Sequence, residues 1–109
     1  MTAIKARKGS ANIFHDLGFS DAEAEEALAK SELISAIATT IKGRKLTQAE
    51  AARLCGTDQP TLSKVLRGRM ESITIDKLAH WLTALGRNVE IRIGRRVNVR
   101  GGRIAVQPI

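Results

Sequence analysis

The stretch that decides the fold is LTQAEAARLCGTDQPTLSKVLRG, residues 46–68. Thr47 is followed three residues later by Glu50, a capping-box pattern that predicts the start of a helix over 48–55. Gly56 comes next and can adopt the left-handed conformation in which many helices end. The side chains expected to face the core from this helix are Ala51, Ala52, Leu54 and Cys55.

A second helix is predicted over 59–67, because Asp58 is a favourable N-cap and Pro60 is tolerated in a first helical turn. On a helical wheel its apolar side chains gather on one side. They are Leu62, Val65 and Leu66. The opposite side and the N-terminal end carry Gln59, Pro60, Thr61, Ser63, Lys64 and Arg67.

These exposed groups differ from the long charged side chains that usually oppose the core of a bundle helix. Amide, hydroxyl and ammonium groups can bond to base edges, and a proline ring can contact a thymine methyl group. The two helices and their short glycine-containing turn therefore predict a helix-turn-helix, in which the second helix enters the DNA major groove.

Further helices are predicted on both sides of this unit. Ser20 and Glu23 form another capping box, and the helix that follows is expected to end near Gly43, either unbroken or split into two halves near Lys30. The residues that recur at three- and four-residue spacing along it, and so are expected on its inner stripe, are Ala24, Ala27, Leu28, Ser31, Ile34, Ala38 and Ile41. Thr74 is predicted to cap a last helix. The apolar face of that helix is Leu78, Trp81, Leu82 and Leu85.

Beyond residue 87 the spacing of the apolar residues changes. NVEIRI, 88–93, alternates apolar and charged residues, which predicts a strand with one buried face. RVNVRGGRIAV, 96–106, is typical of a hairpin that turns at its two adjacent glycines. An isolated hairpin is marginal in water, so a second copy of the chain is expected to supply a further sheet edge. The residues expected at this dimer interface are Trp81, which could equally serve the core, and Val89, Ile91 and Ile93.

The 109 residues have room for one small domain. We expect a flexible basic arm over 1–11, a helical domain over 12–86 with the helix-turn-helix at 47–67, and a C-terminal β element over 87–109. The formal net charge is +7. The excess of Lys and Arg lies in the arm, around the helix-turn-helix and at the C-terminus, whereas 16–32 is acidic. A basic domain favours a nucleic acid or an acidic partner.

The remaining residue types argue against several other classes of protein. Cys55 is the one cysteine, so no internal disulfide forms, which fits a cytoplasmic location, and no apolar run approaches the roughly 20 residues of a membrane span. His15 and His80 are far apart and have no further ligands at metal-binding spacing. No set of residues typical of a catalytic site stands out. We therefore expect no enzyme activity, no metal and no cofactor.

Residues 46–68 resemble the helix-turn-helix of the XRE/Cro regulators, the family of the phage repressors. The matching positions are Leu46, Thr47, Gln48, Glu50, Ala52, Gly56, Gln59, Pro60, Ser63, Arg67 and Gly68. NIFHDLGFSDAEAE before this stretch and SITIDKLAHWLTALGRNVEIRI after it further resemble the flanks of HigA-like antitoxins, so the resemblance covers 12–93. The sequence departs from the pattern at Cys55, where an aliphatic residue is usual, and the resemblance fades after Gly94.

The alternation after residue 87 predicts a C-terminal β-strand or hairpin used in dimerisation, and the resemblance implies the rest of a mainly α fold: a phage-repressor-like bundle of four to five helices. It also implies that Gln48 contacts a phosphate from a helix N-terminus and that Gln59 reads a base, most naturally adenine. The groove would be lined by Pro60, Thr61, Ser63 and Lys64, and Arg67 would hold the DNA backbone. The further residues expected at the DNA by charge or position are Arg44, Lys45, Thr47 and Arg69.

The implied function is repression by a homodimer on a palindromic double-stranded DNA operator. The chain would be the antitoxin of a type II toxin–antitoxin pair, and would both autoregulate its operon and neutralise a RelE-like toxin. Two alternatives stay open: a stand-alone XRE regulator without a toxin, and a protein-binding adaptor without DNA activity. The acidic helix start either favours the helix N-terminus and stays solvated or helps to hold the basic toxin. Its residues are Asp21, Glu23, Glu25 and Glu26.

Overall fold

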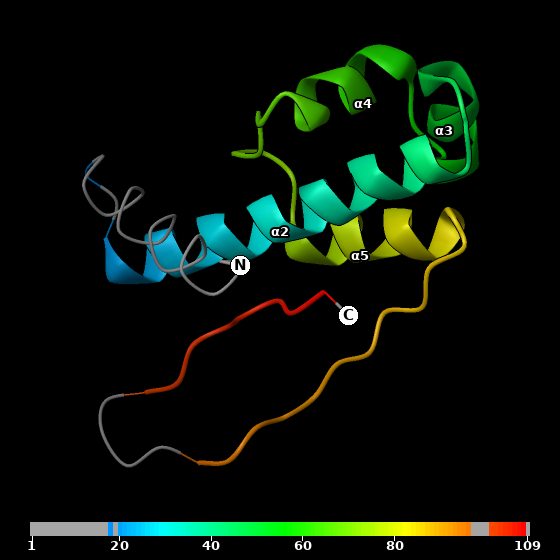
Figure 1. Cartoon of the computed structure of the whole chain (residues 1–109). Coiled ribbons are helices and arrows are strands. Elements are labelled where there is room, and N and C mark those ends of the chain that lie inside the picture. The colour runs from blue at the N-terminus through cyan, green and yellow to red at the C-terminus, as the bar shows by residue number, and fades with distance from the viewer. Residues whose placement is uncertain (1–17, 19, 97–100, 109) are drawn as a thin grey trace.

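The computed structural model describes residues 18, 20–96 and 101–108. Within these residues lie four helices, which in chain order are α2 (Asp21–Gly43), α3 (Gln48–Cys55), α4 (Gln59–Leu66) and α5 (Ile75–Ala84). α2 and α5 run side by side, and α3 and α4 form a lobe next to the C-terminal half of α2 (Figure 1). The basic arm predicted at 1–11 lies outside the described part of the chain. None of the described helices is long and apolar enough to cross a membrane.

Each helix begins at a side chain that caps it. At the start of α2 the Ser20 hydroxyl accepts from the Glu23 N–H at 3.1 Å, and the Glu23 carboxylate accepts from the Ser20 N–H at 2.9 Å. Thr47 and Glu50 form the same pair of bonds at the start of α3, at 3.1 and 2.8 Å. Thr74 caps α5. The two capping boxes and the Thr74 cap predicted from the sequence are confirmed.

α2 is one continuous helix of 23 residues, so the break considered near Lys30 does not occur. Lys30 is buried on the inner face, where its aliphatic stem takes a place in the stripe. Most of the predicted stripe faces the core, but Ala38 is exposed. Leu33 and Ile37, which lie outside the predicted stripe, also belong to the core, because the buried side of α2 is wider than that stripe.

The core lies where α2, α4 and α5 meet, and α3 closes one end of it. Its largest fully buried side chains are Ile37, Leu62, Leu78 and Leu85. Ala51 and Ala52 let α3 approach closely because their side chains are small. Trp81 is 2% exposed and belongs to this core. Of the two roles predicted for Trp81, the structure therefore gives the core role, and Trp81 offers no surface in this chain for contact with a second copy.

Leu54 was expected in the core, and this prediction is wrong: its side chain is 44% exposed. The reason is the direction of α3. Successive residues turn by about 100°, so Ala51, Ala52 and Cys55 cover an arc of about 100°, and Leu54 points about 110° away from its centre. The two alanines, rather than the larger Leu54, therefore decide which side of α3 packs on the core.

After α5 the chain continues as two open segments, 88–96 and 101–108, which lie along one side of the molecule (Figure 1). Val89 and Val106 pack against the core, but Ile91 and Ile93 are 84% and 90% exposed. No β-strand is present in the described residues of either segment, so the predicted hairpin is not seen. The residues that would join the two segments, 97–100, lie outside the described part.

Candidate nucleic-acid interface

α3 and α4 are joined by a three-residue turn that begins at Gly56. Gly56 has a φ of 72°, the left-handed conformation that favours glycine, and it ends α3. The next N–H, from Thr57, donates to the Ala52 carbonyl at 2.9 Å. Asp58 then accepts from the Thr61 N–H at 2.7 Å and starts α4. The turn is therefore fixed at both ends by hydrogen bonds that the sequence pattern predicts.

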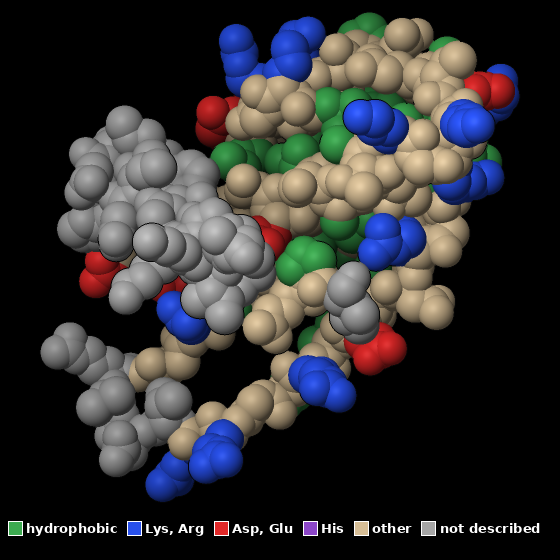
Figure 2. Space-filling model, viewed as in Figure 1, with side chains coloured by type: hydrophobic (Ala, Val, Ile, Leu, Met, Phe, Trp, Pro, Cys, Tyr) green, Lys and Arg blue, Asp and Glu red, His purple; other side chains and the backbone are tan. Residues whose placement is uncertain are grey.

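The two sides of α4 differ as the helical wheel predicts. Leu62 and Val65 are buried in the core, and Leu66 packs partly against it. The side away from the core is exposed at Gln59, Pro60, Thr61, Lys64 and Arg67, and half-buried at Ser63. Lys and Arg side chains project around the lobe that contains α3 and α4 (Figure 2). We call these six residues, together with Gln48 at the start of α3, the α4 face.

The side chains of the α4 face differ in how they are engaged. Arg67 donates to the Ser63 hydroxyl at 3.1 Å, so these two groups are held together at the C-terminal end of the helix. Thr61 is engaged at the N-terminal end, where its side chain as well as its N–H bonds to the Asp58 carboxylate. In the described part of the chain, no hydrogen bond or ion pair involves the side chains of Gln59 or Lys64. These two groups point outward from a rigid, capped helix and are available to a ligand.

Thr47 and Arg44 were also expected at the DNA, and both have structural partners. The Thr47 hydroxyl caps α3. The Arg44 guanidinium donates to the Leu85 carbonyl at 3.0 Å, which joins the C-terminal ends of α2 and α5. Arg87 makes a second link between these ends through the Thr40 hydroxyl, at 2.9 Å. The sequence alone does not reveal the Arg44 bond, because its partner lies 41 residues away.

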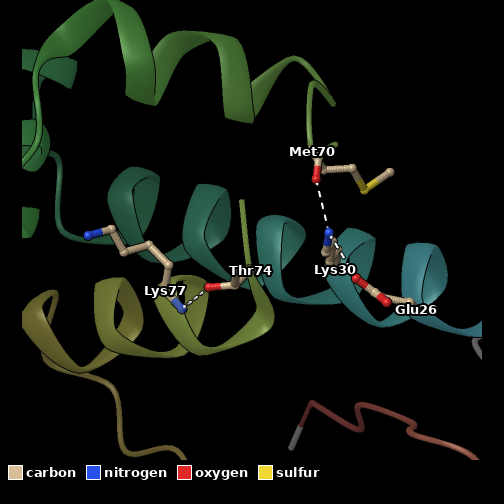
Figure 3. A network of polar contacts seen from close by, with 5 residues as sticks. All are labelled: Glu26, Lys30, Met70, Thr74 and Lys77. Carbon is tan, nitrogen blue, oxygen red and sulfur yellow. Dashed lines mark hydrogen bonds and ion pairs between the residues drawn. The ribbon is translucent and has the colours of Figure 1, made fainter. Parts of the chain in front are cut away.

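The segment after α4 contains Arg69 and is supported from α2 by a buried lysine. The Lys30 ammonium donates to the Met70 carbonyl at 3.1 Å and pairs with the Glu26 carboxylate at 3.1 Å (Figure 3). The Lys30 side chain is 9% exposed. On the other side, the Arg69 N–H donates to the Lys64 carbonyl at 3.1 Å. Reasoning from the sequence missed Lys30, although its place between apolar positions of α2 was a usable signal.

The charged groups near the interface follow from these bonds. The capping hydrogen bonds to Thr61 lower the pKa of Asp58, and those to Thr47 lower the pKa of Glu50. Burial raises the pKa of the Cys55 thiol, which lies 3.8 Å from the Trp81 carbonyl. Within the described residues no three acidic, histidine or cysteine side chains gather as metal ligands. His15 lies outside that part of the chain.

Of the residues predicted at a dimer interface, Trp81 is separated from the others because it lies in the core. Val89 is half-buried against the core, and Ile91 and Ile93 are exposed. The α4 face, in contrast, brings the residues predicted for base contacts onto one exposed helix.

Comparison with known proteins identifies the class to which this arrangement belongs. The chain matches the family model of the helix-turn-helix domain over residues 13–94, which is most of its length, and it therefore belongs to that family. A solved structure assigned to the XRE family of transcriptional regulators matches with a TM-score of 0.70 and 33% sequence identity, over 79% of this chain and 98% of that chain. The chain is thus a helix-turn-helix protein of the XRE type. No curated protein matches it.

Proposed function

We propose that this protein is a sequence-specific DNA-binding repressor that inserts α4 into the major groove. The observation that carries the proposal is the α4 face: outward-pointing amide, hydroxyl and ammonium groups on a helix whose other side is locked into the core. Rigid presentation matters because base contacts need fixed geometry, and because groups without partners in the chain need not break bonds before they bind.

Each residue of the interface has a proposed role. Gln59 reads a base, most naturally adenine, and Lys64 contacts a guanine or a phosphate. Pro60, Thr61 and Ser63 line the groove. Gln48 binds a phosphate at the N-terminus of α3, where the helix dipole favours an anion. Arg67 and Arg69 are proposed to contact the DNA backbone. Arg44 can do the same through the N–H groups that its bond to Leu85 does not use. Thr47 is proposed to lie at the DNA beside Gln48.

We further propose that the repressor acts as a homodimer on a palindromic operator. Two α4 helices related by two-fold symmetry would lie roughly 34 Å apart, one turn of DNA. The exposed Ile91 and Ile93 support a dimer, because two large apolar side chains on one edge of the molecule gain from burial against a second copy.

An antitoxin role, with a RelE-like toxin as partner in the cytoplasm, is proposed from the resemblance of 12–93 to HigA-like antitoxins. The alternative, a stand-alone XRE regulator, has an observation in its favour. The acidic start of α2 is already engaged: Glu23 caps the helix, Glu26 pairs with Lys30, and Glu25 lies 3.6 Å from Arg103. A basic toxin would have to compete with these contacts.

The α4 face is tested by the Gln59→Ala and Lys64→Ala variants on the DNA upstream of the gene. Each change should weaken specific binding by about 1–3 kcal/mol if the side chain contacts a base. Fluorescence anisotropy with operator and with scrambled DNA separates specific from non-specific binding. Lys77→Ala is the matched control, since it removes one exposed positive charge from α5 instead. Operator binding that survives both α4 changes would refute the proposed face.

The toxin partner is tested separately. Co-purification with the product of the adjacent gene should recover a small basic protein if the chain is an antitoxin. Reversal of the four acidic charges at the start of α2, on Asp21, Glu23, Glu25 and Glu26, should weaken that complex. A complex whose affinity is unchanged by the reversal would exclude the acidic helix start as the toxin site.

A further inference from the structure

The segment Val89–Ile93 has an apolar edge that leaves the body of the protein. Val89 packs on the core, while Ile91 is 84% and Ile93 is 90% exposed. In an extended chain, residues two apart share a face, so the three side chains form one row that starts in the core and ends in solvent. In the described part of the chain, nothing covers the outer end of this row.

A groove lies beside the inner end of the row. It has a volume of about 510 Å³ and separates the chain at 88–90 from the chain at 106–108. Leu33 and Ala36 of α2 and Leu82 of α5 form its apolar part. Among the described residues, no backbone hydrogen bond crosses between the two segments, so their N–H and C=O groups are open to another strand.

The sequence of the row is complementary to itself. If VEIRI is laid antiparallel against a second copy with Ile91 on the two-fold axis, Val89 lies opposite the partner's Ile93 and Glu90 opposite the partner's Arg92. All apolar residues then fall on one face, and each charged residue meets its opposite on the other face. The chain's own 101–108 has no acidic residue to face Arg92, and its Arg103 is paired with Glu25.

We propose that residues 89–93 pair antiparallel with the same residues of a second copy, with Ile91 on the two-fold axis. The partner's Ile93 then lies over Val89 and covers the groove formed by Leu33, Ala36 and Leu82. This arrangement rests on the homodimer of the proposed function and specifies its contacts. Its two-fold axis is the element that would relate the two α4 faces on a palindromic site.

Charge reversal tests the register. Glu90→Arg and Arg92→Glu each place like charges opposite one another twice in a dimer, and should raise the dimer dissociation constant by about tenfold to a hundredfold. The double variant restores both pairs and should dimerise like the wild type. A mixture of the two single variants should form heterodimers, because each then meets its opposite. Sedimentation of the full chain measures all four samples.

The outcomes distinguish this inference from the proposed function. A double variant as weak as the single variants, or single variants that dimerise like the wild type, would overturn the register. Both positions are exposed, so circular dichroism should show intact helices in every variant. Operator binding is measured on the wild type in parallel. Its absence would refute the repressor while leaving the sedimentation result to decide the strand pairing.

Discussion

Arg44 connects two helix ends whose last carbonyl groups have no partners within their own helices. Its guanidinium bonds to the Leu85 carbonyl just after α5, and Arg87 bonds from the opposite side to Thr40 of α2. A basic side chain that lies against the carbonyl groups at the C-terminal end of a helix stabilises that helix, since these groups bear partial negative charge. Arg44 therefore stabilises the fold whatever it adds at the DNA.

We expect Arg44→Ala to lower the free energy of unfolding by about 1 kcal/mol, because one charge-assisted hydrogen bond is lost at a partly exposed site. Urea unfolding measures this change. Lys45→Ala is the matched control: it removes the neighbouring positive charge, and no hydrogen bond or ion pair of the Lys45 side chain is present among the described residues. An Arg44→Ala variant as stable as the wild type but deficient in DNA binding would show that Arg44 acts on DNA alone.

Asp58 makes the start of α4 sensitive to acid. The Thr61 hydrogen bonds lower its pKa below the ordinary value of 3.8, so the folded state favours the carboxylate. Its stabilising effect is therefore complete above the unfolded-state pKa and is lost as the pH falls through the folded-state pKa.

We expect Asp58→Ala to lower the melting temperature at pH 7 and to differ less from the wild type below pH 3.8. Asp58→Asn keeps an N-cap that does not titrate, and should melt like the wild type at pH 7 but lose less stability in acid. Thermal unfolding between pH 2 and pH 7 tests this, with Glu23 and Glu50 unchanged in every sample. Equal acid sensitivity of the wild type and Asp58→Asn would contradict the assignment.

At the scale of elements, Lys30 connects α2 to the segment that follows α4. A buried ammonium is stable only when it is paired, and Lys30 is paired on both sides, with Glu26 and with the Met70 carbonyl. The segment with Arg69 is therefore held between the end of α4 and the middle of α2.

We expect Lys30→Met to preserve the packing of the stem but to leave the Met70 carbonyl with only its longer bond from the Ile73 N–H, at 3.4 Å, which lowers stability by about 1–3 kcal/mol. Hydrogen exchange at the Arg69 amide should quicken by more than exchange at the core amides of α5. Glu26→Gln is the control, because its amide oxygen can still accept from Lys30. Exchange at Arg69 that matches the wild type would show that Lys30 does not hold this segment.

Short sequence patterns predict where each helix begins and ends, whereas contacts between residues far apart in the sequence determine which side of each helix faces the core. The caps at Ser20, Thr47 and Asp58 depend on partners three residues away, so the sequence predicts them directly. The exposure of Leu54 depends on which side of α3 meets α5, which no local pattern determines. The bonds of Lys30 and Arg44 join residues 40 and 41 positions apart, and only the assembled fold brings them together.

The same limit applies to the candidate site. The exposed side of α4 could be predicted because Leu62 and Val65 determine its rotation. The predicted hairpin could not be judged from alternation alone, since alternation shows that a segment can form a strand but not which strand it pairs with. Val89 and Ile93 illustrate this: one is anchored on the core and the other is exposed.

At the scale of the whole molecule, truncation after Arg87 should give a monomer, because it removes Val89, Ile91 and Ile93 together. A monomer neutralises about half as many phosphates, so the slope of log affinity against log salt should fall to about half. Light scattering measures the mass, and anisotropy at several salt concentrations measures the slope. Circular dichroism must show intact helices, since Val89 and Val106 also pack on the core. A truncated chain that remains dimeric would place the interface elsewhere.

The separation of the two sides of α4 has an evolutionary consequence. Leu62 and Val65 maintain the fold, whereas the side chains of Gln59 and Lys64 make no hydrogen bond or ion pair in the described part of the chain. Mutations at these two positions should therefore leave the scaffold nearly as stable as before. After gene duplication, two copies could diverge toward different operators by drift and selection on these outward positions alone, without passing through an unfolded intermediate.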